Sequence, residues 1–338
     1  MTKIAFFELE GWEEQILKKE FSSDELFLSD KKLDEYDGKE GYDFDVVSVF
    51  VNSKLDKATI KRFPKLKSIA TRSTGYDHVD LGVCKDCNVT VTFVPGYGDN
   101  TVAEFAFGLI LSLTRKIYAA IDQIKETGKF SFTGFRGVDI KGKTIGIIGT
   151  GRIGKEMIKI AKGFSMEVIA YDPYPNEEYA KEMGYRYVSL DELLKNSDVI
   201  SIHVPYIPET HHLINKKNMG IIKKGAYLVN TARGGIVETD ALLDGLRNGI
   251  LAGAGLDVLE EEGDVKDEMK FLNESNVEGG KMKTIIENQM LMKMPNVLMT
   301  PHNAFNTQEA LERILKTTIE NIKGFLAGNP IVKNIVKG

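Results

Sequence analysis

The sequence is poor in cysteine and lacks both long hydrophobic runs and long basic runs. Its 338 residues include only two cysteines, Cys84 and Cys87, in the lone CxxC of CKDC. This spacing suits a redox pair or half of a zinc site, but no second CxxC or CxxH completes a metal site. We therefore expect no metal, and we expect both thiols to lie about one turn apart on a short helix packed against its domain.

The other absences narrow the class of partner. Lys and Arg total 44 against 49 Asp and Glu, a net charge of -5, so the basic surface that nucleic acids require is missing. No apolar run reaches the roughly 20 residues of a membrane helix. The opening MTKIAFFELEGWEEQ turns acidic too soon for a signal peptide. These features predict a reduced, cytoplasmic protein without nucleic-acid or membrane partners.

Short β-branched runs alternate with helical patterns along almost the whole chain. This alternation is typical of βαβ units in a parallel sheet. The predicted strands lie at 3–7, 46–51, 66–70 and 89–93, and then at 144–148, 167–171, 199–204, 227–230, 253–258 and 297–300. The sequence thus predicts an α/β fold with two doubly wound parallel-sheet domains.

The order of the segments predicts a discontinuous first domain. Residues 101–113, TVAEFAFGLILSL, are apolar around most of a helix and are interpreted as the connection between domains. An amphipathic helix over 307–326 is expected to return to the first domain. The predicted domains are residues 1–100 with 303–338, and residues 101–302. Residues 260–293 break the rhythm and are interpreted as a partly helical surface insertion.

A glycine-rich loop follows the strand predicted at 144–148 and opens a helix. It contains GxGxxG as Gly149, Gly151 and Gly154. The first glycine permits a tight turn, the second lets the backbone approach a pyrophosphate, and the third lets helix pack on strand. The amides of Arg152 and Ile153 would then point at the phosphates from the helix N-terminus. The context of strand and helix predicts a dinucleotide site.

An acidic residue stands at the end of the next strand. Asp172 in IAYDPYP lies 18 residues after Gly154, close to the spacing at which such a carboxylate accepts the ribose hydroxyls. A 2′-phosphate would suffer like-charge repulsion there, and no arginine follows directly, so NAD is predicted rather than NADP. The alternative is a carboxylate that only caps the next turn.

Charged side chains follow three later strands. Arg233 lies in TARGG after a strand, Asp257 and Glu262 lie at and beyond the end of another, and His302 follows the last. A planar guanidinium can hold a carboxylate through two bonds, and a histidine paired with a carboxylate is an oriented acid/base. The alternatives are a solvated surface arginine and a structural histidine behind a proline.

Two further histidines are adjacent, His211 and His212 in ETHHLIN. We expect them on a helix, where neighbouring residues face in different directions and cannot both face one ligand. They are therefore interpreted as structural.

In chain order, GTGRIG, YDPY, SIHVP, NTARGG, GLDVLEEE and TPHNAF resemble the D-isomer-specific 2-hydroxyacid dehydrogenase family over nearly the whole chain. The resemblance implies a Rossmann-type NAD-binding domain inserted into a flavodoxin-like substrate domain. It implies that Arg233 binds the substrate carboxylate, that His302 is the acid/base, that Glu262 holds and charges this histidine, and that Asp257 binds the nicotinamide carboxamide. Two segments would line the cofactor: His203, Val204 and Pro205 at the adenine, and Thr231, Ala232 and Arg233 at the nicotinamide.

The first domain resembles the same family in TRSTGYDHVD and VPGYGDNTVAE. By this likeness the amides of Thr74 and Gly75 hold the substrate carboxylate opposite Arg233. Tyr97 resembles the substrate-facing tyrosine of the D-lactate dehydrogenase branch, and Phe305 helps to wall the pocket. The 40 residues from Glu262 to His302 also favour that branch. Two departures concern the size of the pocket: Asn306 stands where branch members commonly carry an aromatic residue, and Gly263 stands where many family members have proline.

The resemblance therefore implies an NAD-dependent dehydrogenase that reduces pyruvate to D-lactate. A reductase of branched or aromatic 2-oxoacids, such as 2-oxoisocaproate or phenylpyruvate, is the alternative within enzymes. A dinucleotide-sensing scaffold, like the corepressors that share this fold, is the alternative outside them. A homodimer through the NAD-binding domain is expected, with residues 117–138 at the interface because they include Phe130, Phe132 and Phe135.

Overall fold

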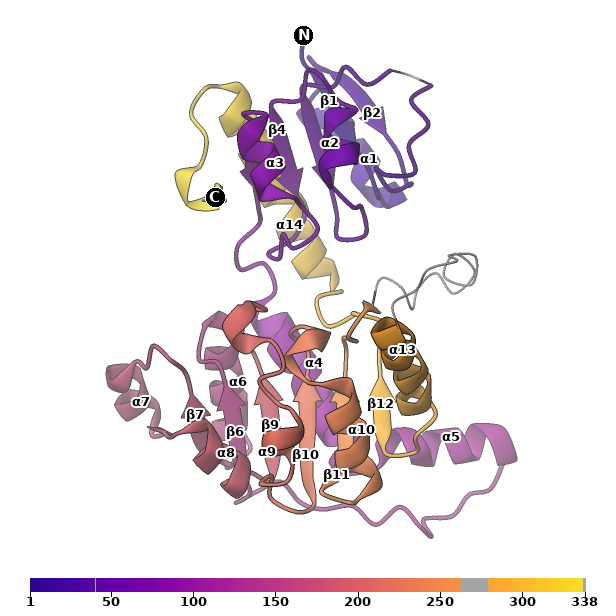
Figure 1. The fold of residues 1–338 in the computed structure, drawn as a ribbon, viewed down its shortest axis with the longest axis vertical. Coiled ribbons are helices and arrows are strands. Elements are labelled where there is room, and N and C mark those ends of the chain that lie inside the picture. Colours follow the sequence, from indigo (N-terminus) through magenta and orange to yellow (C-terminus); the bar gives the residue numbers. More distant parts are fainter. Residues whose placement is uncertain (40, 263–278, 337–338) are drawn as a thin grey trace. The chain divides into compact units, whose positions relative to one another are not determined.

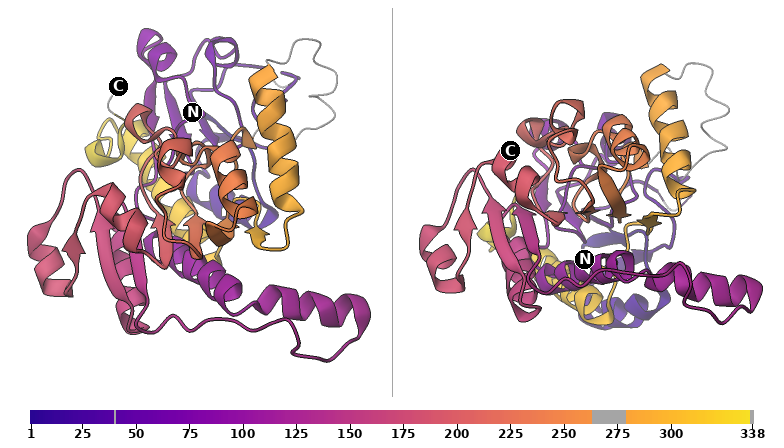
Figure 2. Two further views of the ribbon diagram at one scale, coloured as in Figure 1. Left: turned by 60° about the horizontal axis from the view of Figure 1, so that its bottom comes forward. Right: turned by 90° about the horizontal axis from the view of Figure 1, so that it is seen from below.

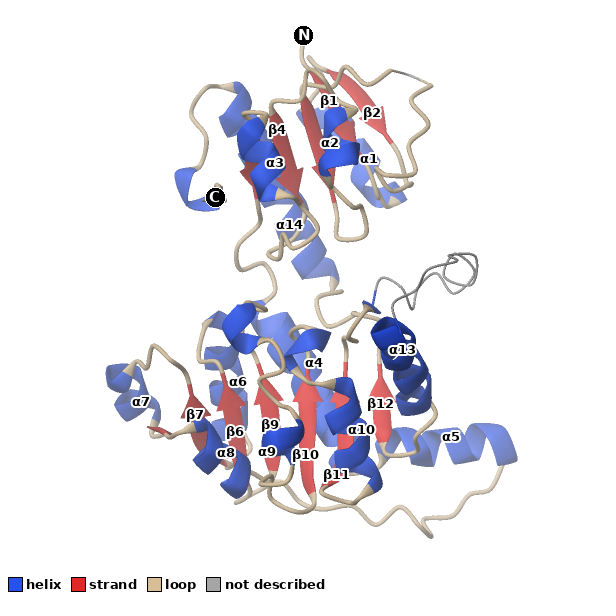
Figure 3. Ribbon diagram, in the orientation of Figure 1, coloured by secondary structure: helices blue, strands red, loops and turns tan. Residues whose placement is uncertain are grey.

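The computed structural model describes residues 1–39, 41–262 and 279–336, which form two compact units. Unit 1 comprises Met1–Tyr97 and Thr307–Gly338, and unit 2 comprises Gly98–Asn306. In each unit a parallel sheet carries helices on both faces (Figure 1, Figure 3). Both units are therefore doubly wound α/β folds, as the sequence predicts.

The sheet of unit 1 has the strand order β2-β1-β3-β4-β5, the order of flavodoxin-like folds. Every pairing in it is parallel. The inner strands β3 and β4 are buried at every residue, as expected where helices cover both faces. The strands are β1 (Lys3–Phe6), β2 (Glu25–Leu28), β3 (Val46–Val49), β4 (Ser68–Thr71) and β5 (Thr90–Thr92).

Four helices cover the two faces of this sheet. On one face lie α2 (Lys57–Lys61) and α3 (Leu81–Asp86). On the other lie α1 (Gly11–Glu20) and α14 (Gln308–Leu326), which bury aliphatic side chains against β1 and β3. The α14 helix, more than 200 residues away in the chain, thus completes the core that the first strands begin.

A buried arginine braces the carboxyl ends of the unit 1 strands. Arg72 directly follows β4, and its side chain is only 2% exposed. Its Nη2 donates to the carbonyl oxygens of Phe7 and Glu8 at 2.7 Å each, and its Nε lies 3.6 Å from Glu13 Oε1. Burial raises the pKa of Glu13, and the nearby guanidinium offsets part of that rise. This cation is therefore committed to groups of unit 1.

A carboxylate fastens the next loop. Glu8, which has a left-handed φ of 56°, accepts the backbone N–H groups of Asn52 at 2.9 Å and Ser53 at 3.0 Å. It also accepts the Ser53 hydroxyl at 2.5 Å and the N–H of Phe50 at 3.2 Å. One side chain after β1 thus holds the loop that follows β3.

The described part of unit 2 has a sheet in the order β12-β11-β10-β9-β6-β7-β8, again with parallel pairings throughout. This is the Rossmann order with one more strand beyond it. The chain reverses direction along the sheet between β6 and β9, which makes their carboxyl ends a switch point. The strands are β6 (Thr144–Ile148), β7 (Glu167–Tyr171), β8 (Arg186–Tyr187), β9 (Val199–Ile202), β10 (Ala226–Asn230), β11 (Leu251–Leu256) and β12 (Val297–Met299).

The two faces of the unit 2 sheet carry separate cores. One face packs against α4 (Asp99–Thr114) and α6 (Arg152–Gly163), and α7 (Glu177–Met183) lies at its β8 edge. The other packs against four helices (Figure 1), which are α8 (Leu190–Asn196), α9 (Lys216–Met219), α10 (Thr239–Arg247) and α13 (Gly279–Met292). The exception is α5 (Ile117–Thr127), which buries none of its residues and projects away from the rest of unit 2 (Figure 2).

Ten predicted strands each overlap an observed strand, and two observed strands were not predicted. These two are β2 and β8, which both lie at the edge of a sheet. The β2 strand is exposed at Glu25 and β8 has two residues, so neither shows a buried β-branched run. Residues 263–278 of the insertion predicted at 260–293 lie outside the described residues, and α13 supplies its helical part.

The helix predicted around His211 and His212 is wrong. A short 3-10 helix, η1 (Pro208–Thr210), ends before them, and His212 has a left-handed φ of 49°. Their rings stack with centroids 3.8 Å apart. A turn can bring adjacent side chains to one side, which a helix cannot.

The two cysteines differ in burial. Cys84 is buried in α3, and burial raises its pKa to about 11. Cys87 ends that helix and is exposed, so the prediction that both thiols pack against the domain is wrong for Cys87. Within the described residues no cluster of His, Cys, Asp and Glu has the arrangement of a metal site. Nor does any helix of that part of the chain have the length and apolarity to cross a bilayer.

Candidate active site

Six strands of unit 2 end at one edge of the sheet, and a residue predicted for the site follows each of them. Because all pairings are parallel, the carboxyl ends of these strands meet at the same edge (Figure 1). In sheet order from β12 to β7, the residues are His302, Asp257, Thr231, His203, Gly149 and Asp172. The fold therefore gathers at one edge residues that are up to 153 positions apart in the sequence.

The glycine loop requires glycine at two positions. Gly149 has a left-handed φ of 93°, and a Cβ there would lie 2.8 Å from the backbone of His203. A Cβ on Gly154 would collide with the carbonyl oxygen of Gly149. Gly151, by contrast, faces open space and begins α6 without a side-chain cap. The loop thus leaves the backbone amides at the start of α6, those of Arg152 and Ile153 among them, accessible to an anion.

A second feature of this edge fits a bound dinucleotide. Thr231 follows β10, and its hydroxyl is buried without a hydrogen-bond partner among the described residues. Buried hydroxyls normally form a hydrogen bond, so one without a protein partner indicates a place where a ligand can bind. Arg152 is the first residue of α6, and its Nε donates to Asp99 at 2.8 Å. The residues present therefore fit a nicotinamide dinucleotide.

The Asp172 carboxylate is held by its own surroundings. Its Oδ2 accepts the backbone N–H of Thr150 at 2.7 Å and the hydroxyl of the same residue at 3.0 Å. Its Oδ1 accepts the N–H of Tyr174 at 2.9 Å. The last bond is the turn cap that the sequence left open as an alternative. The carboxylate therefore caps this turn at the carboxyl edge of the sheet, and its bond to a ribose stays a prediction.

His203 lies at the end of β9. Its Nε2 is 2.8 Å from the Ser201 hydroxyl, and its backbone N–H donates to Ile148 at 2.7 Å. Loss of solvent around the ring lowers the pKa of His203 to about 4. Val204 is buried beside it and Pro205 is exposed. His203 is therefore neutral at physiological pH.

Asn230 shapes the loop that carries Arg233. Its Oδ1 accepts the N–H of Ala232 at 3.0 Å, and its Nδ2 donates to the carbonyl of Arg233 at 2.9 Å. A Cβ on Gly234 would collide with the backbone of Leu259, so the next residue packs directly on the loop after β11. Asn230 is the first residue of NTARGG, and the sequence motif alone predicted no role for it. The signal was a polar residue that ends a buried strand.

Asp257 organises the loop that contains His302. The side chain lies in a residue only 1% exposed, and it accepts the Thr300 hydroxyl at 2.5 Å and the N–H groups of Asn303 and Ala304 at 2.8 Å each. Burial raises the pKa of Asp257, and these hydrogen bonds offset part of the rise. The backbone N–H of His302 donates to the carbonyl of the same aspartate at 2.8 Å. The end of β11 thus fixes the turn after β12.

His302 is paired with Glu262. Its Nδ1 lies 3.2 Å and 3.1 Å from the two carboxylate oxygens, and the two side chains are 28% and 23% exposed. The histidine has a left-handed φ of 54°, a conformation that histidine adopts more readily than most residues. Because Nδ1 faces the carboxylate, Nε2 is the ring nitrogen that faces elsewhere. This is the geometry of an oriented acid/base.

A second histidine–carboxylate pair uses Glu260, two residues before Glu262 in the sequence. The Nε2 of His212 is 2.6 Å from Glu260 Oε1, and Glu260 Oε2 accepts the hydroxyl of Thr239 at 2.7 Å. The backbone N–H of His212 also donates to Gly235 at 2.9 Å. This pair connects the loop after Arg233 to the start of α10 and to the segment that bears Glu262. The sequence interpretation of His212 as structural gave it no partner.

The predicted substrate residues of the first domain lie in loops of unit 1. The Thr74 hydroxyl donates to Val94 at 2.7 Å, and the carbonyl of Gly75 accepts the Ser73 hydroxyl at 2.6 Å. The carbonyl of Tyr97 accepts Nε of Arg313 at 2.6 Å. Phe305 belongs to unit 2, three residues after His302. The structure thus distributes the predicted substrate residues over both units.

Comparison with known proteins identifies the family. The model of the family described as "D-isomer specific 2-hydroxyacid dehydrogenase, NAD binding domain" matches residues 107–304. The chain is 37% identical to a 2-hydroxyacid dehydrogenase homolog of Zymomonas mobilis, over 99% of this chain and 100% of that one. It is 36% identical to an aromatic 2-oxoacid reductase of Clostridium sporogenes, over 83% of each.

Solved structures agree with the sequence comparison. The D-lactate dehydrogenase of Aquifex aeolicus, in complex with NAD and lactic acid, matches with a TM-score of 0.88 and 35% identity, over 99% of each chain. Its cofactor agrees with the edge of unit 2, where two close-packed glycines, an open third glycine and an uncapped helix N-terminus lie together. The chain therefore belongs to the D-isomer-specific 2-hydroxyacid dehydrogenase family, and its Rossmann domain binds NAD.

Proposed function

We propose that this member of the family reduces pyruvate to D-lactate. The observation that carries the chemistry is the His302–Glu262 pair at the carboxyl edge of the NAD-binding sheet. The choice of pyruvate is supported by the similarity to the Aquifex aeolicus D-lactate dehydrogenase along almost the whole chain. The separation of 40 positions from Glu262 to His302 also supports it.

His302 is the proton donor for the reduction. Bound NADH supplies the hydride, which goes to the 2-oxo carbon and leaves an alkoxide that needs one proton. With Nδ1–H donated to Glu262, the imidazolium delivers this proton from Nε2 to the oxygen. In the reverse direction the neutral ring takes the proton from the 2-hydroxyl group. The carboxylate fixes the ring and balances its charge, which keeps Nε2 in one position.

Arg233 binds the carboxylate of the substrate through its planar guanidinium and stabilises the charge that develops on the carbonyl oxygen. Asn230 positions this residue through two hydrogen bonds to the loop. From unit 1, the amides of Thr74 and Gly75 and the side chain of Tyr97 are assigned to substrate binding. From unit 2, Phe305 is assigned to it as well.

The remaining assignments concern the cofactor. The three glycines and the amides of Arg152 and Ile153 hold the pyrophosphate, and Asp172 binds the adenosine ribose. The adenine contacts His203, Val204 and Pro205, and the nicotinamide contacts Thr231, Ala232, Arg233 and His302. Asp257 accepts three hydrogen bonds from the loop after β12. A carboxylate has roughly four acceptor positions, which leaves one for the carboxamide of the nicotinamide.

We also propose that the chain forms a homodimer through the NAD-binding domain. The α5 helix projects from unit 2 and exposes Ile117, Tyr118, Ile121 and Ile124 between 43% and 58%. Phe130 and Phe132 in the following segment are more than nine-tenths exposed. A surface of this kind is costly in water unless a partner covers it. Light scattering after size exclusion should give a dimer for the wild type and a monomer for Ile121→Asp. Ile16→Asp in α1 is the control, because Ile16 is 39% exposed against 47% for Ile121.

The substrate proposal is tested by following NADH consumption with pyruvate, hydroxypyruvate, 2-oxoisocaproate and phenylpyruvate in parallel. We expect the highest kcat/KM with pyruvate. If phenylpyruvate has the highest value, the activity is that of an aromatic 2-oxoacid reductase, the alternative that the similarity to the Clostridium sporogenes enzyme supports. If 2-oxoisocaproate has the highest value, the activity is that of a branched 2-oxoacid reductase. If NADH binds and no 2-oxoacid is reduced, the protein is a dinucleotide-sensing scaffold.

A further inference from the structure

Tyr187 lies close to the acidic residue of the cofactor site although it comes from another strand. It ends β8, and Ala170 of the neighbouring strand β7 is its partner in the sheet register. Asp172 follows β7 directly. The Tyr187 hydroxyl lies 2.8 Å from the hydroxyl of Thr150, which in turn bonds Asp172 at 3.0 Å. Thr150 is the residue between the first two glycines of the loop, and it is 6% exposed.

The number of hydroxyl protons fixes the direction of these bonds. The ionised carboxylate of Asp172 can only accept, so the single proton of the Thr150 hydroxyl goes to Oδ2. The Tyr187 hydroxyl must therefore donate to Thr150. It accepts in turn from the hydroxyl of Tyr185 at 3.0 Å and from the N–H of Asn176 at 3.1 Å. The result is a one-way chain of donors, Tyr185 to Tyr187 to Thr150 to Asp172.

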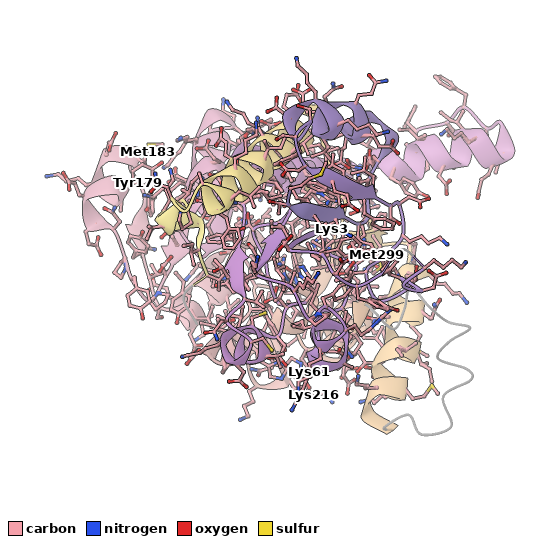
Figure 4. The ribbon with its side chains drawn as sticks, turned by 90° about the horizontal axis from the view of Figure 1, so that it is seen from above. Lys3, Lys61, Tyr179, Met183, Lys216 and Met299 are labelled. Atoms are coloured by element: carbon pink, nitrogen blue, oxygen red, sulfur yellow. The ribbon has the colours of Figure 1, made fainter. Side chains whose placement is uncertain are left out.

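The two tyrosines of this hydrogen-bond series are held in place by ring packing. The rings of Tyr185 and Tyr187 meet edge to face with centroids 5.4 Å apart, and Tyr179 packs against Tyr185 at 6.3 Å. Figure 4 shows Tyr179 and Met183 one turn apart on α7, and both pack against the core of this sheet face. Burial raises the pKa of Tyr185, so this hydroxyl stays protonated as the first donor. The two-residue strand β8 thus presents a rigid hydroxyl to the glycine loop.

This series of hydrogen bonds determines the orientation of the Asp172 carboxylate. Oδ2 receives two hydrogen bonds from Thr150 and is occupied, while Oδ1 receives one from Tyr174 and keeps an acceptor position. Chains of hydroxyl donors polarise one another, which strengthens the last bond. The carboxylate is therefore held with Oδ2 on Thr150 and with an acceptor position of Oδ1 left over. A ribose hydroxyl can donate to Oδ1, whereas a 2′-phosphate can only meet its negative charge.

We propose that Thr150 and Tyr187 are positioning residues for cofactor selection, which hold the Asp172 carboxylate in the orientation that accepts NADH and rejects NADPH. The proposal rests on the assignment of Asp172 to the adenosine ribose. Neither hydroxyl needs to touch the cofactor. Their effect reaches it through the aspartate, so it concerns discrimination between cofactors more than hydride transfer.

The test measures dissociation constants of NADH and NADPH for the full-length protein, by fluorescence titration without substrate. Thr150→Val and Tyr187→Phe each remove one hydroxyl with little change of shape. Loss of the Thr150 hydroxyl removes one of the two bonds to Oδ2 of Asp172 and should weaken NADH binding about tenfold or more. Tyr187→Phe should weaken it about threefold to fivefold. Both should bring the NADPH and NADH constants closer together by similar factors, and both should change KM for NADH more than kcat.

Two variants serve as controls. Tyr174 is 88% exposed and bonds Asp172 only through its backbone, so Tyr174→Phe should leave both constants within about twofold of wild type. Thr150→Ser keeps the hydroxyl and should restore most of the affinity and the discrimination that Thr150→Val loses. If Thr150→Val does not fold, as judged by its thermal unfolding, Tyr187→Phe at the sheet edge decides the question.

Asp172→Asn separates the two levels of the proposal. It should weaken NADH binding more than either hydroxyl variant. If it weakens NADH binding while Thr150→Val and Tyr187→Phe behave like Tyr174→Phe, the ribose assignment stands and the positioning role is wrong. If Asp172→Asn binds NADH as tightly as wild type, the ribose assignment itself is wrong and the positioning proposal falls with it.

Discussion

At the carboxyl edge of each sheet, one carboxylate accepts backbone N–H groups from a neighbouring loop, but the two loops have different roles. In unit 1, Glu8 collects N–H groups from the loop after β3, and in unit 2, Asp257 collects them from the loop after β12. In unit 1 the neighbouring cation, Arg72, is 2% exposed and bonded to carbonyl groups. In unit 2 the fixed loop presents His302, which remains 28% exposed.

Burial, more than residue type, separates a charged group with a structural role from one with a catalytic role. Both edges carry an arginine, a glutamate and a carboxylate-held loop. In unit 1 these groups are bonded to other groups of the protein, so their loss should lower the free energy of unfolding. In unit 2 Asp257 is buried as well, but Arg233, Glu262 and His302 stay partly exposed, so their loss should appear in catalysis.

The largest effect is expected at His302. His302→Asn tolerates the left-handed backbone but cannot carry a proton, and positioned proton transfer contributes about 10²- to 10⁴-fold. We expect kcat for pyruvate reduction to fall by at least 100-fold without a change in thermal unfolding. His211→Asn, an exposed histidine of the same chain, should stay within about twofold of wild type. Similar kcat values for the two variants would end the assignment of His302 as the acid/base.

The second effect contrasts the two arginines. Arg72→Met leaves Glu13 buried beside an apolar side chain, and breaking a buried pair costs about 3 to 5 kcal/mol. Urea unfolding should show a loss of that size. Arg233→Met should change the unfolding free energy by less than about 1 kcal/mol and should instead raise KM for pyruvate and lower kcat. Equal destabilisation by both substitutions would remove the distinction between the two edges.

The third effect is a pH dependence that originates in unit 2. His203 has a pKa of about 4 in the folded protein and about 6.5 when unfolded, so the unfolded chain binds more protons between these values. Stability should fall as the pH drops from 6.5 to 4, by about 2 to 3 kcal/mol from this residue. In His203→Gln, urea unfolding across this range should lose that part of the slope. A slope identical to wild type would show that the ring protonates freely in the folded state.

The smallest effect concerns the loop that bears Arg233. Asn230→Ala removes two hydrogen bonds from that loop, each contributing about 0.5 to 1.5 kcal/mol. We expect kcat/KM for pyruvate to fall about tenfold, with most of the change in KM. Asn230→Asp keeps the bond from Ala232 and should lose less. Were both variants as active as wild type, the loop would need no support from this side chain.

The sequence predicts much of the unit 2 edge because strand ends can be read locally. Buried β-branched runs followed by Gly149, Asp172 or His302 mark where a parallel sheet gathers its ligands. The chain could not reveal β8, because two residues at an edge have no hydrophobic pattern. For the same reason it could not reveal that Tyr187 reaches Thr150, a contact between residues 37 positions apart.

Turns are the other source of error. A helical period was assumed for His211 and His212, but a left-handed residue placed their rings in a stack and brought His212 to Glu260. Similarly, the sequence suggested a cofactor role for Asp257 without showing the three hydrogen bonds that it makes to the loop after β12. Such bonds depend on backbone conformations of single residues, which periodicity does not encode.

The most direct test of the account combines hydride transfer with chirality. The protein is incubated with pyruvate and NADH that carries deuterium at the transferable position of the nicotinamide, and lactate is analysed by chiral chromatography and mass spectrometry. The account predicts D-lactate with deuterium at carbon 2. L-lactate, or D-lactate without the label, would contradict it.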